Sequence, residues 1–297
     1  MNRARILITG GSGFIGRNLA EQLAGSYQVY APRHQELDLL DSDAVLAFLE
    51  EHRFDAVLHS ATPNASRNPK GDISKVLPNS LRMFFNLVRG SAHFGQLLYF
   101  GSGAEYDMRH YQPLMPEEAF GLHIPADDYG FAKYVMQRTA ERAARIVNLR
   151  VFGVFGKYED WEIRFISNAC CKALFGLPIT LRQNVRFDYL WIDDLVRLTR
   201  HFLENPADRP DYNVCTSDVV DLVSLAEKVR EVSGKSIDIK VAIPGFKRAY
   251  SGNNQKLMAR QKGGFAFTPQ DEAIQTLYRW YEANRSLIDP DKLRVDK

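Results

Sequence analysis

The stretch ILITGGSGFIG, residues 6–16, decides the fold. A short apolar, β-branched run ends in glycines, and a helical pattern begins directly after them. Gly10, Gly13 and Gly16 have the spacing G-x-x-G-x-x-G. Between a strand and a helix, such glycines permit a tight turn and let the backbone approach a pyrophosphate, whose charge faces the free N–H groups of the helix start. The stretch therefore predicts a dinucleotide-binding loop.

Strand-like and helix-like patterns alternate through the first half of the chain. The expected strands are nearly continuous apolar runs, which is typical of parallel strands buried on both faces. Their alternation with helices predicts an α/β fold with a Rossmann-like, doubly wound parallel sheet. We expect strands at 5–9, 28–32, 55–61, 96–102 and 147–153, and helices at 14–25, 42–52, 73–94 and 129–143.

The alternation loosens after about residue 155 of the 297. We therefore expect a dinucleotide-binding domain over 1–155, to which 187–215 returns, and a smaller α/β substrate-binding domain over 156–297. The aspartates Asp193 and Asp194 are expected to cap the helix that follows them.

Composition excludes several function classes. The net charge is only +2, which gives no surface for coating a nucleic acid. No apolar run reaches the roughly 18 residues of a membrane span, and the first strand begins too early to leave room for a signal peptide. Three cysteines without metal-like spacing predict reduced thiols and no metal. We expect a cytoplasmic protein.

The end of the second strand bears on the cofactor. NAD enzymes usually place a carboxylate there for the ribose 2′-hydroxyl, whereas a basic residue favours a 2′-phosphate. The segment YAPRHQE offers Arg33 and His34 before any carboxylate. We expect NADP(H), with Arg33 on the phosphate and Arg3 or Arg17 as helpers. Arg33 as a solvated loop charge, with NAD(H) as the cofactor, is the alternative.

The segment YGFAK places Tyr129 and Lys133 four residues apart, on one face of a helix. Tyrosine alone is a poor acid at neutral pH because its reference pKa is about 10. A nearby ammonium favours the phenolate and lowers that pKa. The pair can then exchange a proton with a carbonyl or an alcohol. Ser102, at the end of an expected strand in YFGSGAEYD, would donate a hydrogen bond to the same oxygen.

These motifs resemble the extended short-chain dehydrogenase/reductases, the NAD(P)-dependent nucleotide-sugar epimerase, dehydratase and reductase family. The resemblance also covers DLLD (38–41), LHSAT (58–62), LRVFGVFG (149–156) and FDYLWIDDL (187–195). It implies an enzyme with Ser102, Tyr129 and Lys133 as the catalytic set, in which Tyr129 transfers the proton and Lys133 also binds the nicotinamide ribose. The implied cofactor-binding residues are Gly10, Gly13, Phe14, Ile15, Gly16, Arg33, Asp38, Leu39, Ser60, Ala61, Thr62, Asn79, Tyr129 and Lys133.

The two residues after Ser102 distinguish members of this family. Dehydratases carry an Asp-Glu pair there, whereas this chain has Gly103 and Ala104, which cannot transfer protons. The pattern is most similar to the GDP-fucose synthase group, whose epimerisation cysteine falls at Ala104 and whose histidine maps onto Arg164. The resemblance therefore implies an NADPH-dependent 4-keto sugar reductase, an oxidoreductase of deoxysugar biosynthesis, without epimerisation. A UDP-galactose-type 4-epimerase with tightly bound NAD, and a non-catalytic cofactor sensor or scaffold, stay open as alternatives.

The substrate side rests on weaker patterns. The partner implied is a nucleoside-diphosphate sugar, whose nucleotide, sugar and product stereochemistry the sequence does not identify. The family's diphosphate-binding arginine is replaced by Phe187, with Arg186 one residue earlier. The long segment 108–128 could close over the sugar, and the roles of Glu105, His110 and His123 stay open. The expected substrate contacts are Ser102, Gly103, Ala104, Phe152, Arg164 and Arg186.

The resemblance also implies a homodimer formed by two helices of each subunit, here 73–94 and 129–144. Their outer faces would include Met83, Phe84, Tyr134 and Met136. Packing of these side chains inside one chain is the alternative.

Overall fold

A computed structural model describes residues 3–63, 72–261 and 264–294. The chain forms two compact units. The first comprises Met1–His110, Pro116–Val151 and Val196–Val214, and the second comprises Tyr111–Met115, Phe152–Leu195 and Cys215–Lys297. The segment 187–215, which we expected to return to the first domain, thus contributes to both units. Only its residues from Val196 to Val214 complete the first unit.

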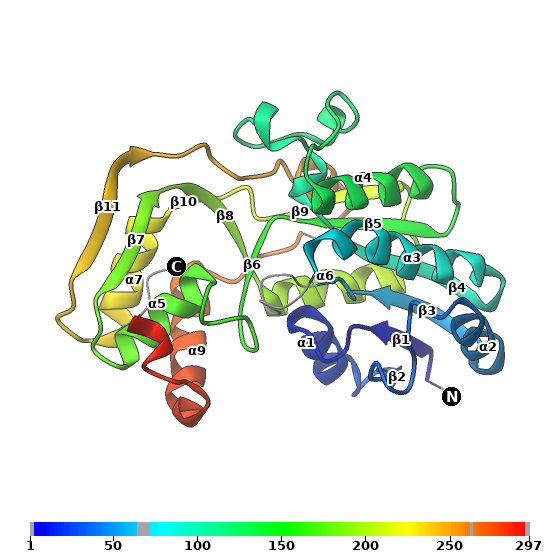
Figure 1. The fold of residues 1–297 in the computed structure, drawn as a ribbon, viewed down its shortest axis with the longest axis horizontal. Coiled ribbons are helices and arrows are strands. Elements are labelled where there is room, and N and C mark those ends of the chain that lie inside the picture. Colours follow the sequence, from blue (N-terminus) through cyan, green and yellow to red (C-terminus); the bar gives the residue numbers. More distant parts are fainter. Residues whose placement is uncertain (1–2, 64–71, 262–263, 295–297) are drawn as a thin grey trace. The chain divides into compact units, whose positions relative to one another are not determined.

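A six-stranded parallel sheet forms the centre of the first unit (Figure 1). Its order is β2-β1-β3-β4-β5-β9, so β2 and β3 flank β1 on opposite sides. This arrangement confirms the doubly wound α/β fold. The carboxyl ends of β1 and β3 form the point where the winding reverses, where such sheets bind ligands. The strands are β1 (Arg5–Thr9), β2 (Gln28–Tyr30), β3 (Phe54–His59), β4 (Phe94–Ser102), β5 (Ile146–Val151) and β9 (Asp211–Val214).

Among the described residues, four helices accompany this sheet, together with α6, whose first residues belong to the second unit. Helix α3 packs on both α2 and α4, so these three form one layer (Figure 1). Helices α1 and α6 are joined where Arg200 Nη2 donates to the carbonyl oxygen of Gln22 at 3.1 Å. Right-handed crossovers place these two sets on opposite faces of the sheet. The helices are α1 (Phe14–Leu23), α2 (Ser42–His52), α3 (Val76–Arg89), α4 (Asp128–Ala140) and α6 (Ile192–Glu204).

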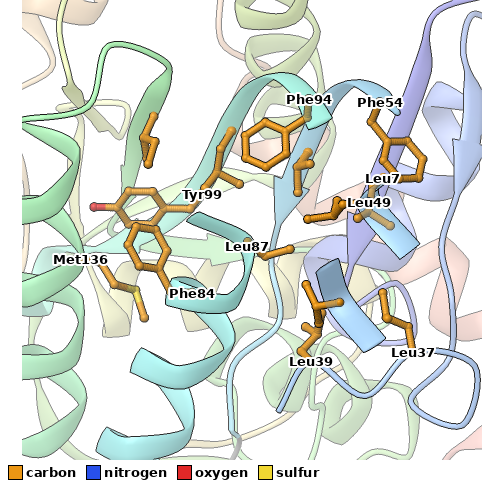
Figure 2. Close-up of a cluster of buried hydrophobic side chains, with 14 of the residues drawn as sticks. Leu7, Leu37, Leu39, Leu49, Phe54, Phe84, Leu87, Phe94, Tyr99 and Met136 are labelled. Carbon is orange, nitrogen blue, oxygen red and sulfur yellow. The ribbon is translucent and has the colours of Figure 1, made fainter. Parts of the chain in front are cut away.

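A hydrophobic cluster lies between the sheet and the layer of α2, α3 and α4 (Figure 2). Phe84 of α3 packs edge-on against Tyr99 of β4, with ring centroids 5.2 Å apart. Met136 of α4 belongs to the same cluster and is 1% exposed. Each such side chain contributes roughly 1.5–3 kcal/mol when it is fully buried. The expectation that Phe84 and Met136 lie on an outer, dimer-forming face is therefore wrong, because both side chains fill the core.

The boundaries of α3 differ from the pattern read in the sequence. We expected one helix over 73–94, but α3 ends at Arg89 with Gly90 at its C-cap, and Phe94 already begins β4. Pro78 is the third residue of α3, in the first turn, where its missing N–H would have no helical partner in any case. Gly90 and the short 3₁₀ turn Ser91–His93 separate the two elements, and the sequence pattern was read through both.

The described residues of the second unit form two small sheets and four α-helices. Strands β7 and β11 pair in parallel, and β8 lies between β10 and β6. Helices α5, α7 and α9 pack on one another. Among the described residues, no helix is long and apolar enough to cross a membrane. The elements are β6 (Gly153–Phe155), α5 (Phe165–Leu174), β7 (Ile179–Asn184), β8 (Arg186–Trp191), β10 (Val219–Asp221), α7 (Leu222–Ser233), β11 (Ile239–Phe246), α8 (Gln255–Arg260) and α9 (Gln270–Ala283).

Candidate active site

The glycine loop joins β1 to α1 and has the geometry expected for a pyrophosphate cradle. Gly10 has a φ of +73°, and a Cβ built there would lie 2.7 Å from the backbone nitrogen of Ala61. A Cβ on Gly16 would lie 2.2 Å from the carbonyl oxygen of Gly10. Gly13 is the N-cap of α1 and supplies no side-chain cap. Because no side chain caps the helix, its first N–H groups suit an anionic ligand, and the loop fits the phosphates of a dinucleotide.

The end of β3 packs directly against this loop. Ser60 Oγ donates to the carbonyl oxygen of Thr9 at 2.7 Å, and the same Oγ would lie 2.7 Å from a Cβ on Gly16. Ser60 and Ala61, two expected cofactor residues, are thus brought to the glycine loop. Thr62 follows them and is exposed, and Asn79 lies half-buried in the first turn of α3.

The segment after β2 carries Arg33, which we expect to favour NADP(H) over NAD(H), and the further expected cofactor residues Asp38 and Leu39. Arg33 follows β2 and is exposed, with its backbone N–H donating to Glu36 Oε2 at 2.6 Å. Asp38 Oδ1 accepts from the backbone N–H of Leu40 at 2.9 Å, and Leu39 is buried. Arg3 precedes the amino end of β1 and donates to the carbonyl oxygen of Ala24 at 3.3 Å. Arg3 therefore lies at the amino end of β1, whereas the glycine loop lies at the carboxyl end, so Arg3 is not a helper of Arg33.

Arg17 is the other residue expected to help Arg33. It lies in α1, where its Nε is 3.4 Å from Glu21 Oε1. Phe14 and Ile15, two further expected cofactor residues, form the first turn of the same helix and are half-buried. The helix start thus carries three of the expected residues next to the glycine loop.

Ser102 is the last residue of β4 and the N-cap of a single 3₁₀ turn, Gly103–Glu105. Its Oγ accepts from the N–H of Ala104 at 3.2 Å, and its own N–H donates to Glu105 Oε1 at 3.1 Å. This reciprocal pair is a capping box. A serine hydroxyl can donate one hydrogen bond while it accepts another. Acceptance from Ala104 therefore leaves its proton available to a substrate oxygen.

Glu105 lies beneath this turn, completely buried beside Arg150. Arg150 Nε donates to Glu105 Oε2 at 2.7 Å, and Asn148 Nδ2 donates to both carboxylate oxygens, at 3.0 and 2.8 Å. The same guanidinium reaches Asp211 Oδ2 at 2.8 Å through Nη1. Burial raises the pKa of Glu105, and the charge and hydrogen bonds of Arg150 oppose that shift. The Glu105 carboxylate accepts hydrogen bonds from three donors and is ion-paired, so the fold keeps it in a fixed position.

Helix α4 brings Tyr129 and Lys133 to the same turn. Asp127 Oδ1 accepts from the N–H of Gly130 at 2.8 Å and so caps the helix. A Cβ on Gly130 would lie 2.5 Å from the carbonyl oxygen of Ala104, so only glycine allows the helix start to approach the Ser102 turn this closely. Tyr129, the residue before Gly130, is 36% exposed.

Lys133 is buried below Tyr129, with 4% of its surface exposed. Its Nζ donates to the carbonyl oxygen of Phe100 at 2.7 Å. Burial lowers the pKa of Lys133 to about 8, and the Glu105 carboxylate opposes that shift. His59, at the end of β3, is also buried, and burial together with the Lys133 charge lowers its pKa to about 3. His59 is therefore neutral at pH 7, and its Nδ1 shares a 2.7 Å hydrogen bond with Thr9 Oγ1.

The other expected substrate residues belong to the second unit, apart from Gly103 and Ala104 of the Ser102 turn. Phe152 is 7% exposed and packs against Tyr250, with ring centroids 5.5 Å apart. Arg164 is the exposed N-cap residue of α5. Arg186 begins β8, with its guanidinium 5.0 Å from the ring centroid of Phe246. Side chains alternate along a strand, so Arg186 lies on the face opposite Phe187.

Two aspartates of the second unit have structural contacts. Asp194 is in the first turn of α6 and accepts from the N–H and hydroxyl of Thr268, both at 2.8 Å. It therefore ties a distant segment to this turn. Asp188 of β8 is completely buried and accepts from the N–H of Thr216 at 2.9 Å and of Ser217 at 2.7 Å. Neither contact was expected from the sequence.

The segment 108–128 is held at several points. The rings of His110 and His123 stack with centroids 3.7 Å apart and planes 11° apart. Glu117 is buried, and its Oε1 accepts from the backbone N–H of Asn213 at 3.1 Å. Asp107 and Arg109, just after the Ser102 turn, form a hydrogen-bonded ion pair with the closest approach at 2.6 Å. The closing movement of this segment stays a prediction.

Sequence reasoning left the role of Glu105 open and missed Asn148 and Arg150; all three support the Ser102 turn. One signal was present, because SGAE (102–105) has the S-x-x-E spacing of a capping box. Arg150 lies 45 positions away from Glu105, so the pairing follows only once β4 and β5 are adjacent.

Relatives with assigned activities span most of this chain. An ADP-L-glycero-D-manno-heptose-6-epimerase of Brachyspira hyodysenteriae is 25% identical over 284 residues, covering 84% of this chain and 87% of the relative. A UDP-glucose 4-epimerase of Bacillus subtilis is 23% identical and covers 94% of this chain and 97% of its own.

Solved structures share the fold at lower identity. A GDP-mannoheptose C4 reductase of Campylobacter jejuni, solved with NADP, matches with a TM-score of 0.80 and 20% identity over 95% of this chain and 99% of its own. A GDP-L-fucose synthetase of Naegleria fowleri matches with a TM-score of 0.81 and 17% identity over 96% and 95%. The Bordetella bronchiseptica enzyme WbmG, solved with NAD, has a TM-score of 0.81 and 19% identity over 95% of each chain.

The sequence pattern of a whole family covers the first unit and the start of the second. The model of the NAD dependent epimerase/dehydratase family matches residues 6–215, which include the glycine loop, Ser102, Tyr129 and Lys133. This chain therefore belongs to the NAD dependent epimerase/dehydratase family, whose members are NAD(P)-dependent enzymes of nucleotide-sugar chemistry.

Proposed function

We propose that the protein reduces a 4-keto nucleoside-diphosphate sugar, of the 6-deoxy type, to the 4-hydroxy sugar at the expense of NADPH. The observation that carries the proposal is the approach of Gly130 to Ala104. It puts the start of α4, with Tyr129, beside a Ser102 turn that holds no acid or base at Gly103 and Ala104. A site with this set can protonate a substrate oxygen, and it lacks the usual residues for elimination or ring epimerisation.

The nicotinamide supplies the hydride when it is bound, and the remaining work falls to side chains of this chain. Ser102 donates a hydrogen bond to the 4-keto oxygen and polarises the carbonyl. Tyr129 delivers its phenolic proton to that oxygen as the alcohol forms. The Lys133 ammonium, held by the Phe100 carbonyl, stabilises the phenolate that remains.

Two groups of residues in the first unit would hold the cofactor. The glycine loop and the N-terminus of α1 would take the pyrophosphate. Arg33 is exposed at the end of β2, where no carboxylate precedes Glu36, and it would bind the 2′-phosphate. This favours NADPH over NADH.

A 4-epimerase is the second candidate. It is supported by the relatives named as epimerases, among them the 4-epimerase of Bacillus subtilis. Such an enzyme also needs only the Ser–Tyr–Lys set, and it returns the hydride to the same sugar without net consumption of cofactor. The basic residue after β2 speaks against the tightly held NAD that this cycle uses.

Homodimerisation and a cytoplasmic location stay part of the proposal. On the exposed side of α3, Phe85 is 40% exposed, while its neighbour Phe84 is buried. Phe85 therefore replaces Phe84 as the side chain by which the helices of two subunits would meet. The three free cysteines are buried, which fits a reducing compartment.

The test uses the full chain with NADPH and a panel of GDP-, CDP-, dTDP- and UDP-linked 4-keto sugars. We expect loss of NADPH with at least one of them and a 4-hydroxy product by NMR. Tyr129→Phe should lower kcat by roughly 10²–10⁴-fold while NADPH still binds. Tyr134→Phe is the matched control, because it removes a hydroxyl from the next turn of α4.

Each other outcome selects a different function. Interconversion of C4 stereoisomers without net NADPH loss would replace the reductase by the epimerase. Cofactor binding without turnover on either substrate class would favour a sensor or scaffold.

A further inference from the structure

Glu105 is a buried acid that the proposed proton transfer does not use. Its Oε1 accepts from the N–H of Ser102 at 3.1 Å and would lie 2.3 Å from a Cβ on Gly101. The carboxylate thus packs against the end of β4. Because Gly101 has no side chain, the Glu105 carboxylate can occupy the space that a Cβ at this position would take.

The same strand end holds Lys133. The carbonyl of Phe100 accepts from Lys133 Nζ, one residue before Gly101 and two before Ser102. Three consecutive residues of β4 therefore connect the Glu105 carboxylate, the Lys133 ammonium and the Ser102 hydroxyl. Glu105 and Lys133 also attract each other as charges.

We propose that Glu105 is a positioning residue of the active site, which holds the Ser102 turn in place and supplies the negative charge that the buried Lys133 ammonium faces. The inference rests on the proposed reductase function and assigns a task to a residue outside the Ser–Tyr–Lys set.

The charged and titratable groups around Lys133 come from three elements besides α4. Glu105 comes from the 3₁₀ turn, His59 from β3, and Arg150 of β5 stands on the far side of Glu105. On α4 itself, Tyr129 lies one turn before Lys133. Tyr99 of β4 is a further buried neighbour of Glu105, and burial, together with the Glu105 charge, raises the pKa of that phenol. Glu105 is the group in this set that favours the ammonium.

Two substitutions separate the two tasks. Glu105→Gln keeps the length and an acceptor oxygen but removes the charge. The pKa of Lys133, already lowered to about 8 by burial, should then fall further. The ammonium is lost as pH rises through that pKa, so the alkaline decline of kcat/KM should move to lower pH, by on the order of one unit. Glu105→Asp keeps the charge and shortens the reach to Ser102 N–H.

The aspartate variant should behave in the opposite way. A turn displaced by about 1 Å costs roughly tenfold to a hundredfold in kcat, while the alkaline decline stays at the wild-type pH. Asp211→Asn is the matched control. It removes a second carboxylate from Arg150, 2.8 Å away, that has no hydrogen bond to Ser102. We expect it to lower the melting temperature and leave the pH profile unmoved.

A second readout needs no substrate. In cofactor-free protein labelled with ¹³C,¹⁵N-lysine, the Lys133 resonance, assigned by its loss in Lys133→Met, reports its titration directly. We expect its midpoint to move to lower pH in Glu105→Gln and to stay in place in Asp211→Asn. This measurement holds even if the reductase proposal fails.

An unmoved Lys133 midpoint in folded Glu105→Gln overturns the electrostatic part of the proposal. A wild-type kcat in Glu105→Asp overturns the positioning part. If Glu105→Gln does not fold, Glu105→Asp still decides through its kcat.

Discussion

Arg33 and Arg3 are two arginines of the first unit at opposite ends of the sheet. Arg33 follows the carboxyl end of β2, and Arg3 precedes β1 and bonds to Ala24. Arg33→Ser should lower kcat/KM for NADPH by roughly tenfold to a hundredfold, since a charge-assisted contact to a phosphate is lost. Its effect with NADH should be small. Steady-state kinetics with both cofactors measure the ratio.

Arg3→Ser is the control for this substitution. It removes the same charge from the end of the sheet that does not carry the glycine loop. We expect kcat/KM with NADPH and with NADH to equal that of the wild type. An unchanged NADPH preference in Arg33→Ser would return Arg33 to a solvated loop charge and reopen the choice of NAD.

Single residues were predictable where local sequence determines their geometry. The glycine loop, Tyr129 and Lys133 stand in short motifs whose turn and helix spacing set where they point. Glu105 was not, although it completes the S-x-x-E spacing after Ser102. Its burial depends on Arg150, 45 positions later, and such a pairing requires the register of two strands.

At the scale of the element, the start of α4 depends on one missing side chain. Gly130→Ala would place a Cβ 2.5 Å from the Ala104 carbonyl oxygen, which is backbone and cannot rotate away. The helix start or the Ser102 turn must then shift. We expect kcat to fall by roughly a hundredfold, because misplacement of about 1 Å has that effect. Binding of NADPH, measured by fluorescence, should change far less.

Gly25→Ala tests the same change where space is open. A Cβ on Gly25 meets nothing within 4 Å. Its kcat should equal that of the wild type. Wild-type turnover in Gly130→Ala would mean that the approach of α4 to the Ser102 turn does not limit catalysis.

The elements themselves were predictable in kind, but their ends and outward faces were not. Helical spacing located α3, yet the expected helix ran through Ser91–His93, past the Gly90 C-cap at which α3 ends. The same spacing led us to expect Phe84 on the outer face, next to Phe85. Which of the two lies inward depends on the neighbouring sheet and α4, and Phe84 does.

At the scale of the molecule, the first unit is discontinuous in sequence. Strand β9 pairs with β5 through Asn148↔Asp211 to Val151↔Val214, and it comes after most of the second unit. A fragment of residues 1–155 lacks this strand and α6. It should therefore leave one edge of β5 and the Arg150 guanidinium incompletely paired.

We expect the fragment 1–155 to lack a cooperative thermal transition and near-ultraviolet circular dichroism, whereas the full chain shows both. A fragment that unfolds as cooperatively as the whole chain would contradict the importance of β9 for the first unit.

The division into units was the least accessible to sequence reasoning. We expected a change of architecture near residue 155 from the loss of alternation, and the first unit's middle segment ends with β5 at Val151. The return of the chain to the first unit has no such signal in the sequence. Strand β8 and α6 follow each other without a break, and the unit boundary falls inside α6, between Leu195 and Val196. No composition change can mark a boundary within one helix.

The partners of Arg150 have a consequence for the order of events during synthesis. Glu105 and Tyr106 leave the ribosome before Arg150, whereas Asp211 and Asn213 are translated about sixty codons after it. While residues 152–210 are being made, the nascent chain contains Arg150 but not yet its partners Asp211 and Asn213. The set of contacts that supports the Ser102 turn is thus completed late, so a chain that stalls before residue 211 would expose the Arg150 charge to chaperones.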